Sequence, residues 1–171
     1  MPNYRRHYVP GHAVFVTLVT FERRPWLTEP DNRETLLSAM HRVKAGHSFD
    51  HVAHVILPDH MHWMFVPGEQ ANFSVIVAAV KRDVTWRMKE KGEANSHSWQ
   101  NRFYDHVIRD ENDFARHLDY IHFNPVRHGV AVSPGSYAWS SFSSWCEKGV
   151  YPPDWGKAGN IPEMIRDMNL E

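Results

Sequence analysis

The stretch HVAHVILPDHMHWMFV, residues 51–66, decides the fold, because it contains two apolar segments and the turn between them. Residues 51–57 and 60–66 are rich in β-branched, aromatic and other apolar side chains, and Pro58-Asp59 provides a tight turn. A connection this short joins antiparallel neighbours, whereas parallel strands need a long crossover. The stretch therefore predicts an antiparallel hairpin.

Further elements are predicted on both sides of this hairpin. In chain order they are a strand over 13–20, a helix from a cap at Asp31 or Asn32 to about Gly46, the hairpin, a helix over 73–88, a strand that includes Val107-Ile108, a helix from about 110 that stops near Pro125 or Gly129, and a short helix after Pro162. The order strand–helix–strand–strand–helix–strand is that of the ferredoxin-like (RRM-like) α+β sandwich, an antiparallel sheet with helices on one face. The other face stays open for a ligand or for the additional helix after residue 110.

Length and composition restrict the class of protein. A chain of 171 residues makes one domain, and 42% hydrophobic with 23% charged residues indicates a globular protein. No run of 18 apolar residues could cross a membrane, and the first residues lack the apolar core of a secretion signal. The single cysteine, Cys146, excludes an internal disulfide and a multi-cysteine zinc site. We expect a cytoplasmic protein with no membrane partner.

Positive charge is concentrated in two segments although the formal net charge is −1. Residues 1–24 contain four arginines against one glutamate, and residues 81–91 contain five basic against two acidic side chains. Local patches matter more to a polyanion than the total charge does. The candidate phosphate contacts are Arg5, Arg6, Arg23, Arg24, Lys81, Arg82 and Arg87. Charge alone fits two solvated basic faces equally well.

Aromatic residues make up 13% of the chain and include candidates for stacking on unpaired bases. These candidates are Trp99, Phe103, Tyr104 and Trp139. Each of them is also a candidate for the hydrophobic core.

His60 and His62 are two residues apart on a predicted strand, so both side chains point to the same face, about 7 Å apart along the backbone. Two imidazoles at this separation can bind one metal ion. Met61, Trp63 and Phe65 alternate to the opposite face and are expected to pack under the helices. A chain with 13 histidines contains about one His-x-His by chance, so the alternative is a pair of exposed strand histidines.

Tyr120 and Asn124 are four residues apart on a predicted helix and therefore share a face. A phenol and an amide on one turn, facing two histidines, could form a nucleophile beside a third metal ligand. The alternatives are a half-buried amphipathic tyrosine and an asparagine that ends the helix before Pro125, since this position disfavours helical backbone.

Several motifs in this order resemble one family, the REP-associated tyrosine transposases, which are relatives of the single-tyrosine HUH transposases. The motifs are PDHMHW at 58–63, the segment 99–110, DYIHFNPV at 119–126 and YAWSSF at 137–142. The resemblance covers most of residues 5–145. It implies one HUH transposase domain over residues 1–145 and a C-terminal tail over 146–171. It also implies a divalent metal at His60 and His62, Tyr120 as the nucleophile, and Asn124 where relatives place a polar third ligand.

The family implies a metal-dependent DNA nickase and strand transferase that cleaves single-stranded DNA beside REP hairpins through a 5′-phosphotyrosine. A phenol with a pKa near 10 needs a nearby cation to become a good nucleophile. Two imidazoles and an amide favour Mn²⁺ by ligand softness, whereas abundance favours Mg²⁺.

Two other functions fit the same residues. One is a regulator that binds a DNA hairpin without cutting it, and the other is a hydrolase whose metal activates water. The short link before the helix at residue 110 favours a monomer with its whole site in one chain over a dimer.

Overall fold

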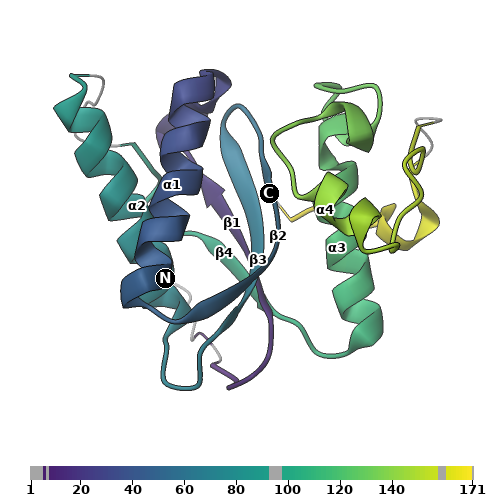
Figure 1. Ribbon diagram of the computed structural model, residues 1–171, viewed down its shortest axis with the longest axis horizontal. Helices are drawn as coiled ribbons and strands as arrows, with labels where there is room; N and C mark the ends of the chain where they lie inside the picture. Colours follow the sequence, from purple (N-terminus) through teal and green to yellow (C-terminus); the bar gives the residue numbers. More distant parts are fainter. Residues whose placement is uncertain (1–5, 7, 93–97, 158–160, 171) are drawn as a thin grey trace.

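The computed structural model describes residues 6, 8–92, 98–157 and 161–170, which form a four-stranded sheet between two helical layers (Figure 1). The strands are β1 (Val14–Val19), β2 (Phe49–Ile56), β3 (His60–Pro67) and β4 (Tyr104–Val107), arranged in the order β2-β3-β1-β4. All three strand pairs are antiparallel. The helices are α1 (Pro30–Gly46), α2 (Phe73–Glu90), α3 (Glu111–Arg127) and α4 (Phe142–Glu147). None of the helices in the described ranges is long and apolar enough to cross a membrane.

The side chains of β3 alternate between the two faces of the sheet, as the sequence predicted. Met61, Trp63 and Phe65 are fully buried and pack in the core that also contains the apolar faces of α1 and α2. The rings of Trp63 and Phe65 stack with their centroids 4.0 Å apart. Helices α1 and α2 thus cover one face of an antiparallel sheet, which confirms the predicted ferredoxin-like α+β fold.

Helix α3 covers the opposite face, with α4 beside it (Figure 1). Phe15 and Met64 face this side of the sheet and pack in a second core with Leu118 and Ile121 of α3. The predicted additional helix therefore exists, and it lies over the histidine face of β3. Because two cores enclose the sheet, neither face of its centre is open to solvent.

One prediction about helix ends was wrong, and of the two stops predicted for the helix after residue 110 the structure has the one near Gly129. Helix α1 starts at Pro30, with Glu29 rather than Asp31 or Asn32 at the N-cap. The Asn32 amide instead donates to the carbonyl of Trp26. Helix α3 continues through Pro125 to Arg127, and its C-cap is His128. The amide of Gly129, which has φ +67°, donates to the carbonyl of Val126 at this C-terminus.

The segment that follows α4 belongs to the second core. Tyr151, Ile165 and Met168 are buried there, and a short 3-10 helix over Glu163–Ile165 corresponds to the predicted short helix. The proposed division into residues 1–145 and 146–171 falls inside α4, and it stays a prediction.

Candidate active site and metal-binding residues

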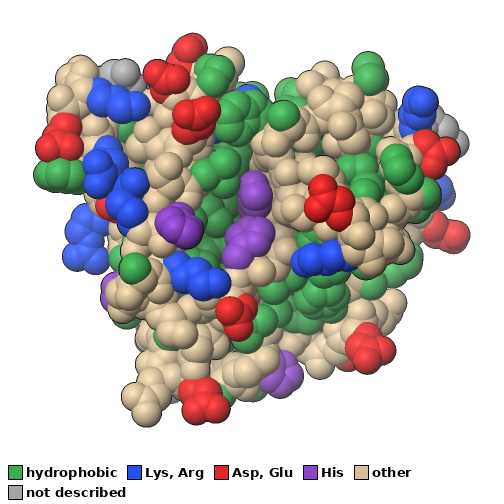
Figure 2. Space-filling view, in the orientation of Figure 1, with side chains coloured by type: hydrophobic (Ala, Val, Ile, Leu, Met, Phe, Trp, Pro, Cys, Tyr) green, Lys and Arg blue, Asp and Glu red, His purple; other side chains and the backbone are tan. Residues whose placement is uncertain are grey.

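The two strand histidines lie together under α3. His60 and His62 are 1% and 0% exposed, and their ring centroids are 4.9 Å apart. On the neighbouring strand they lie opposite Val19 and Thr17. The alternative of an exposed histidine pair is therefore wrong. Figure 2 shows histidine side chains in the hollow between the two helical halves of the molecule.

Hydrogen bonds define which nitrogen of each ring carries the proton. Thr17 Oγ1 lies 2.9 Å from His62 Nδ1, and its single hydroxyl hydrogen goes to the carbonyl of Leu170 at 2.7 Å. His62 Nδ1 must therefore be the donor, which leaves the lone pair on Nε2. His60 Nδ1 lies 2.6 Å from Asp59 Oδ1, and because a carboxylate only accepts, Nδ1 is the donor, so the neutral ring has its lone pair on Nε2.

The surroundings favour the neutral form of His62. Burial, followed by the charges of His60, His128 and Arg127, lowers its pKa well below the usual value. A neutral imidazole is the form that binds a metal ion.

Asn124, one turn after Tyr120 on α3, also has buried polar atoms without partners among the described residues. It is 0% exposed, and neither atom of its amide has a hydrogen-bond partner among the described residues. His62 Nε2 is buried in the same way. A buried polar atom without a partner costs about 1–3 kcal/mol, and a bound ligand or water removes this cost. Imidazole nitrogens and an amide oxygen suit a divalent transition metal, and the residues present therefore fit the expected cation.

Tyr120 lies next to this group. Its ring is fully buried, and the ring centroid is 5.2 Å from that of His62. Tyr120 and Asn124 are one turn apart on α3, as predicted. The backbone amide of Leu170 donates to the Tyr120 hydroxyl at 3.2 Å. Since the carbonyl of Leu170 also binds Thr17, the last described residue connects α3 to β1 across the site.

Charged side chains surround the histidines. Arg23 Nη1 lies 3.1 Å from Asp59 Oδ2, on the same carboxylate that binds His60. Partial burial raises the pKa of Asp59, but the hydrogen bond and charge of His60, together with Arg23, hold it below its usual value. Glu22 and Arg23 have φ values of 53° and 51°, a conformation that is strained in residues other than glycine. Such strain is concentrated at ligand-binding and catalytic sites.

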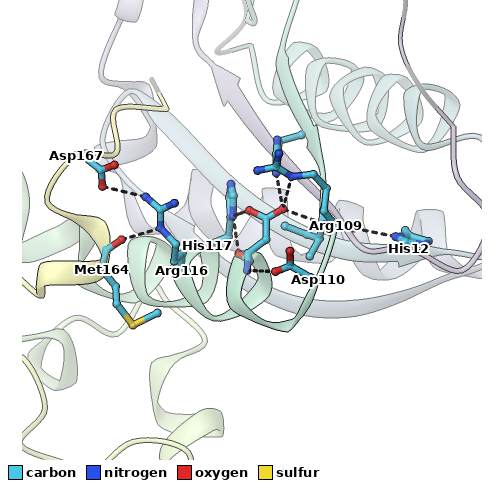
Figure 3. Close-up of polar contacts among 10 residues, drawn as sticks. His12, Arg109, Asp110, Arg116, His117, Met164 and Asp167 are labelled. Carbon is cyan, nitrogen blue, oxygen red and sulfur yellow. Dashed lines mark hydrogen bonds and ion pairs between the residues drawn. The ribbon is translucent and has the colours of Figure 1, made fainter.

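A second group of potential metal ligands, His106, Asp113 and His117, lies between β4 and α3, with the ligand atoms within 4.8 Å of one another. This cluster is compatible with metal binding. Asp113 Oδ2 accepts from His106 Nε2 at 2.8 Å and from the amide of Arg109 at 2.9 Å. His117 Nδ1 and Arg109 Nε, on two residues labelled in Figure 3, also approach the Asp113 carboxylate, at 3.2 and 3.4 Å.

The hydrogen bonds of the two groups differ. Burial raises the pKa of Asp113, but the bonds from His106 and the Arg109 amide lower it to about 2. His117 Nδ1 donates to the carbonyl of Asp113 at 2.8 Å. The ring nitrogens closest to Asp113 are therefore already bonded. A metal would have to break these bonds, whereas at His62 and Asn124 it would supply missing partners.

Several candidate DNA-binding residues border one groove of about 520 Å³ between α2 and residues 98–103. Lys81, Arg82 and Lys89 line it together with Trp86, Trp99 and Phe103. Trp86 is 53% exposed and was not predicted, although its position between the buried residues Val84 and Met88 could have indicated an outward side chain. Figure 2 shows Lys and Arg side chains gathered over α2.

Lys81 and Arg6 extend the positive charge of this groove. Lys81 Nζ donates to the carbonyl of Gln100, and burial, followed by the charge of Arg6, lowers the pKa of Lys81. The Arg6 guanidinium lies 4.0 Å from the centroid of the Phe103 ring and pairs with Asp105 at 2.8 Å.

The remaining candidates lie elsewhere. Arg24 pairs with Glu22 at 2.6 Å, and Arg87 with Asp83 at 3.5 Å. Trp139 is half-buried, with the Arg33 guanidinium 5.3 Å from its ring. Arg5 lies outside the described residues. The structure therefore does not bring all the candidates into one surface.

Comparisons with known proteins give a consistent result. Residues 8–124 match the family described as "Transposase IS200 like". A Haemophilus influenzae protein named as a REP-associated tyrosine transposase is 36% identical over 167 residues, which cover 91% of this chain and 94% of that protein. The REP-associated tyrosine transposase of Escherichia coli K12 is 34% identical over 166 residues, covering 96% of this chain and 95% of its own length.

Solved structures agree with these relatives. The structure of a REP-associated tyrosine transposase bound to a REP hairpin superimposes with a TM-score of 0.82 and 30% identity, covering 99% of both chains. A Deinococcus radiodurans protein shares the fold, with a TM-score of 0.51 and 18% identity over 70% of this chain.

Proposed function

The chain belongs to the REP-associated tyrosine transposases, within the IS200-like transposase family, and from this premise we propose that it cleaves single-stranded DNA beside a REP hairpin through Tyr120. The observation that carries the proposal is the position of the Tyr120 ring, 5.2 Å from the ring of His62, next to lone-pair atoms of His62 and Asn124 that lack partners among the described residues. In this proposal Tyr120 is the nucleophile and the neighbouring atoms form the cation site.

The reaction is a transesterification at phosphorus. The Tyr120 oxygen forms a bond to the phosphorus atom of the scissile linkage, and the bond between phosphorus and the 3′-oxygen breaks. The phenol proton goes to solvent, and the departing 3′-oxygen takes a proton from solvent. The products are a 5′-phosphotyrosine and a free 3′-hydroxyl. Because the covalent link keeps the energy of the phosphodiester, a 3′-hydroxyl can reverse the step without ATP.

His60, His62 and Asn124 would hold a divalent cation, Mn²⁺ or Mg²⁺, which stabilises phenolate and polarises a phosphate oxygen when bound. Two side chains orient the imidazoles for this role. Asp59 accepts from His60 Nδ1, and Thr17 accepts from His62 Nδ1. Partners of this kind fix the tautomer and raise the basicity of a histidine ligand.

The groove along α2 would bind the DNA beside the cleavage site. One of its walls, residues 98–100, hydrogen-bonds to the end of β1, where Val19 lies opposite His60. A single strand leaving Tyr120 over this end of the sheet would enter the groove. Lys81, Arg82 and Lys89 could contact phosphates, and Trp86 could stack on an unpaired base.

The decisive experiment is to incubate the protein with labelled hairpin oligonucleotides and Mn²⁺ and to measure the covalent protein–DNA adduct. We expect an adduct with the wild type and none with Tyr120→Phe. Tyr104→Phe is the matched control, because Tyr104 is 42% exposed on β4. An adduct that persists in Tyr120→Phe would contradict the proposal.

The same experiment separates the alternatives. Salt-dependent hairpin binding without an adduct under any metal would indicate a binding regulator. Cleaved products without a protein linkage, formed equally by Tyr120→Phe, would indicate a hydrolase.

The site is proposed to function within a single chain, since the rings of His60, His62 and Tyr120 lie close together in one chain and Asn124 is one helical turn from Tyr120. A mixture of Tyr120→Phe and His62→Ala proteins tests this. Each variant lacks one essential group, so the mixture should stay inactive. Recovery of adduct formation would indicate a site shared between two chains.

A further inference from the structure

Arg127 lies on the same stripe of α3 as the two proposed site residues of that helix. Tyr120, Asn124 and Arg127 occupy positions i, i+4 and i+7, which lie on one helix face. The guanidinium carbon of Arg127 is 5.5 Å from the centroid of the Tyr120 ring. Its charge also acts on His62, whose pKa is lowered by burial first and by neighbouring cations second. Arg127 thus reaches the centre of the site.

The guanidinium of Arg127 has an unused hydrogen-bonding group. Its Nη1 atom is buried and has no partner among the described residues, and no described carboxylate lies within ion-pair distance of it. Other arginines near the two histidine clusters differ: Arg23 pairs with Asp59, Arg109 with Asp113 and Arg116 with Asp167. A buried charged donor without a partner is costly, and an anionic ligand would remove this cost.

Packing against the Tyr120 ring does not by itself explain why residue 127 is an arginine. A cation over an aromatic ring is attracted to the face of the ring, and this contact uses no N–H donor of the guanidinium. The fixed fork of the guanidinium suits the oxygens of a phosphate. A donor next to the attacking tyrosine is well placed for the charge that develops on phosphate oxygens during attack.

We propose that Arg127 is a further catalytic residue, which donates a hydrogen bond to a non-bridging oxygen of the scissile phosphodiester. This inference rests on the proposed function, because it takes the phosphate beside Tyr120 as the ligand. The contact exists in the bound complex and strengthens as Tyr120 forms its bond to phosphorus. No proton leaves Arg127, because a guanidinium stays protonated in proteins.

The test uses binding as well as turnover. All proteins in the binding test carry Tyr120→Phe. Their affinities are measured for a set of hairpin oligonucleotides, each with one uncharged methylphosphonate at a different linkage of the single-stranded flank. We expect Arg127→Gln to weaken binding of the all-phosphodiester DNA by about tenfold, the size of one charge-assisted hydrogen bond. At one linkage the methylphosphonate should abolish the difference in affinity between the protein that keeps Arg127 and the Arg127→Gln variant, because the charge recognised by Arg127 is gone.

Other variants exclude a merely structural effect. Arg109→Gln, which changes a guanidinium with a 74% exposed side chain at the start of α3, should leave all these affinities unchanged. If the glutamine variant does not fold, Arg127→Lys replaces it in the binding test, because this change keeps the positive charge and removes the guanidinium. With Tyr120 restored, Arg127→Gln should slow adduct formation by about 10²–10³-fold.

The outcomes of the two proposals are distinguishable. If the Arg127 substitution weakens binding equally for every methylphosphonate position, or not at all, the assignment of Arg127 is wrong even when Tyr120 forms an adduct. If one linkage shows the coupling but the wild type forms no adduct, Arg127 binds a phosphate and the proposed cleavage is wrong.

Discussion

Removal of residues 169–171 is expected to speed up the reaction of Tyr120. The backbone of Leu170 makes two hydrogen bonds across the site, one from its amide to the Tyr120 hydroxyl and one to its carbonyl from Thr17. A hydrogen bond contributes about 1 kcal/mol net, so the two together hold the end of the chain in place by about 2 kcal/mol. Their loss would raise the population of the open site by about 30-fold, since 1.4 kcal/mol corresponds to a factor of ten.

The truncation is expected to preserve the fold. Ile165 and Met168 stay buried in the second core, and Arg116 still binds the carbonyl of Met164 at 2.8 Å and Asp167 at 2.9 Å (Figure 3). Leu170→Ala is the matched control, because it keeps both backbone hydrogen bonds and removes only the side chain. Its rate should stay near that of the wild type.

Two measurements check this prediction. The first is the initial rate of adduct formation with a hairpin oligonucleotide in Mn²⁺. The second is independent of DNA: nitration of Tyr120, followed by peptide mass spectrometry, should increase on truncation, while nitration of the exposed Tyr8 and Tyr104 stays constant. A folded truncated protein with an unchanged or lower rate and unchanged nitration of Tyr120 would refute the reasoning.

Three further predictions concern metal binding, acid stability and DNA affinity. Thr17→Val removes the acceptor of His62 Nδ1 and should lower Mn²⁺ affinity by about 10–100-fold in calorimetry, whereas Thr17→Ser should not. Burial, followed by the charge of His51, lowers the pKa of His54 to about 3, so the folded state binds fewer protons than the unfolded state and stability falls as the pH drops below 6.5. By pH 5 the stability lost through this group is about 2 kcal/mol. The free energy of unfolding, measured in urea, should therefore fall less between pH 7 and pH 5 in His54→Gln than in the wild type. An equal fall in the two proteins would contradict the pKa shift. Lys81→Gln should lower the slope of log K for hairpin binding against log salt by about one, whereas Lys148→Gln, on the α4 side, should leave it unchanged.

The face of a strand or helix on which a side chain lies could be predicted from the sequence. The alternation of His60, Met61, His62 and Trp63 correctly assigned each side chain to a face of β3, because neighbouring residues of a strand point to opposite faces. The spacing of Tyr120 and Asn124 likewise placed both on one face of α3. These predictions need only the local period of a strand or a helix.

Helix ends were less predictable, because several residues compete for the same role. Asp31 and Asn32 are good caps, but Pro30 suits the first position of a helix, where its missing N–H is not needed. Pro125 did not end α3, which continues to Arg127, so the proline lies in the last turn of the helix. The amides of Val130 and Ala131 donate to the Pro125 carbonyl at 2.9 and 3.2 Å and close this C-terminus.

Contacts between distant parts of the chain could not be predicted. Thr17 and Leu170 are 153 residues apart, and no local pattern connects them. The cluster of His106, Asp113 and His117 also combines a strand with a helix, so its spacing in the sequence resembles no metal motif. The sequence identified residue types and faces, while the packing of α3 and the end of the chain on the sheet decided which of them meet.

Buried polar atoms that lack hydrogen-bond partners connect these observations to function. Buried polar atoms without partners are costly, and a fold selected for stability alone would have few of them. Among the atoms of this kind in the described residues, His62 Nε2, Asn124 Oδ1 and Arg127 Nη1 belong to residues beside Tyr120 or on the same face of its helix. The first two suit a cation and the last suits an anion, which is the combination that a metal-bound phosphate requires. These atoms are therefore suited to the metal and the DNA of the proposed reaction, whereas in the His106–Asp113–His117 cluster the ring nitrogens closest to Asp113 are already hydrogen-bonded.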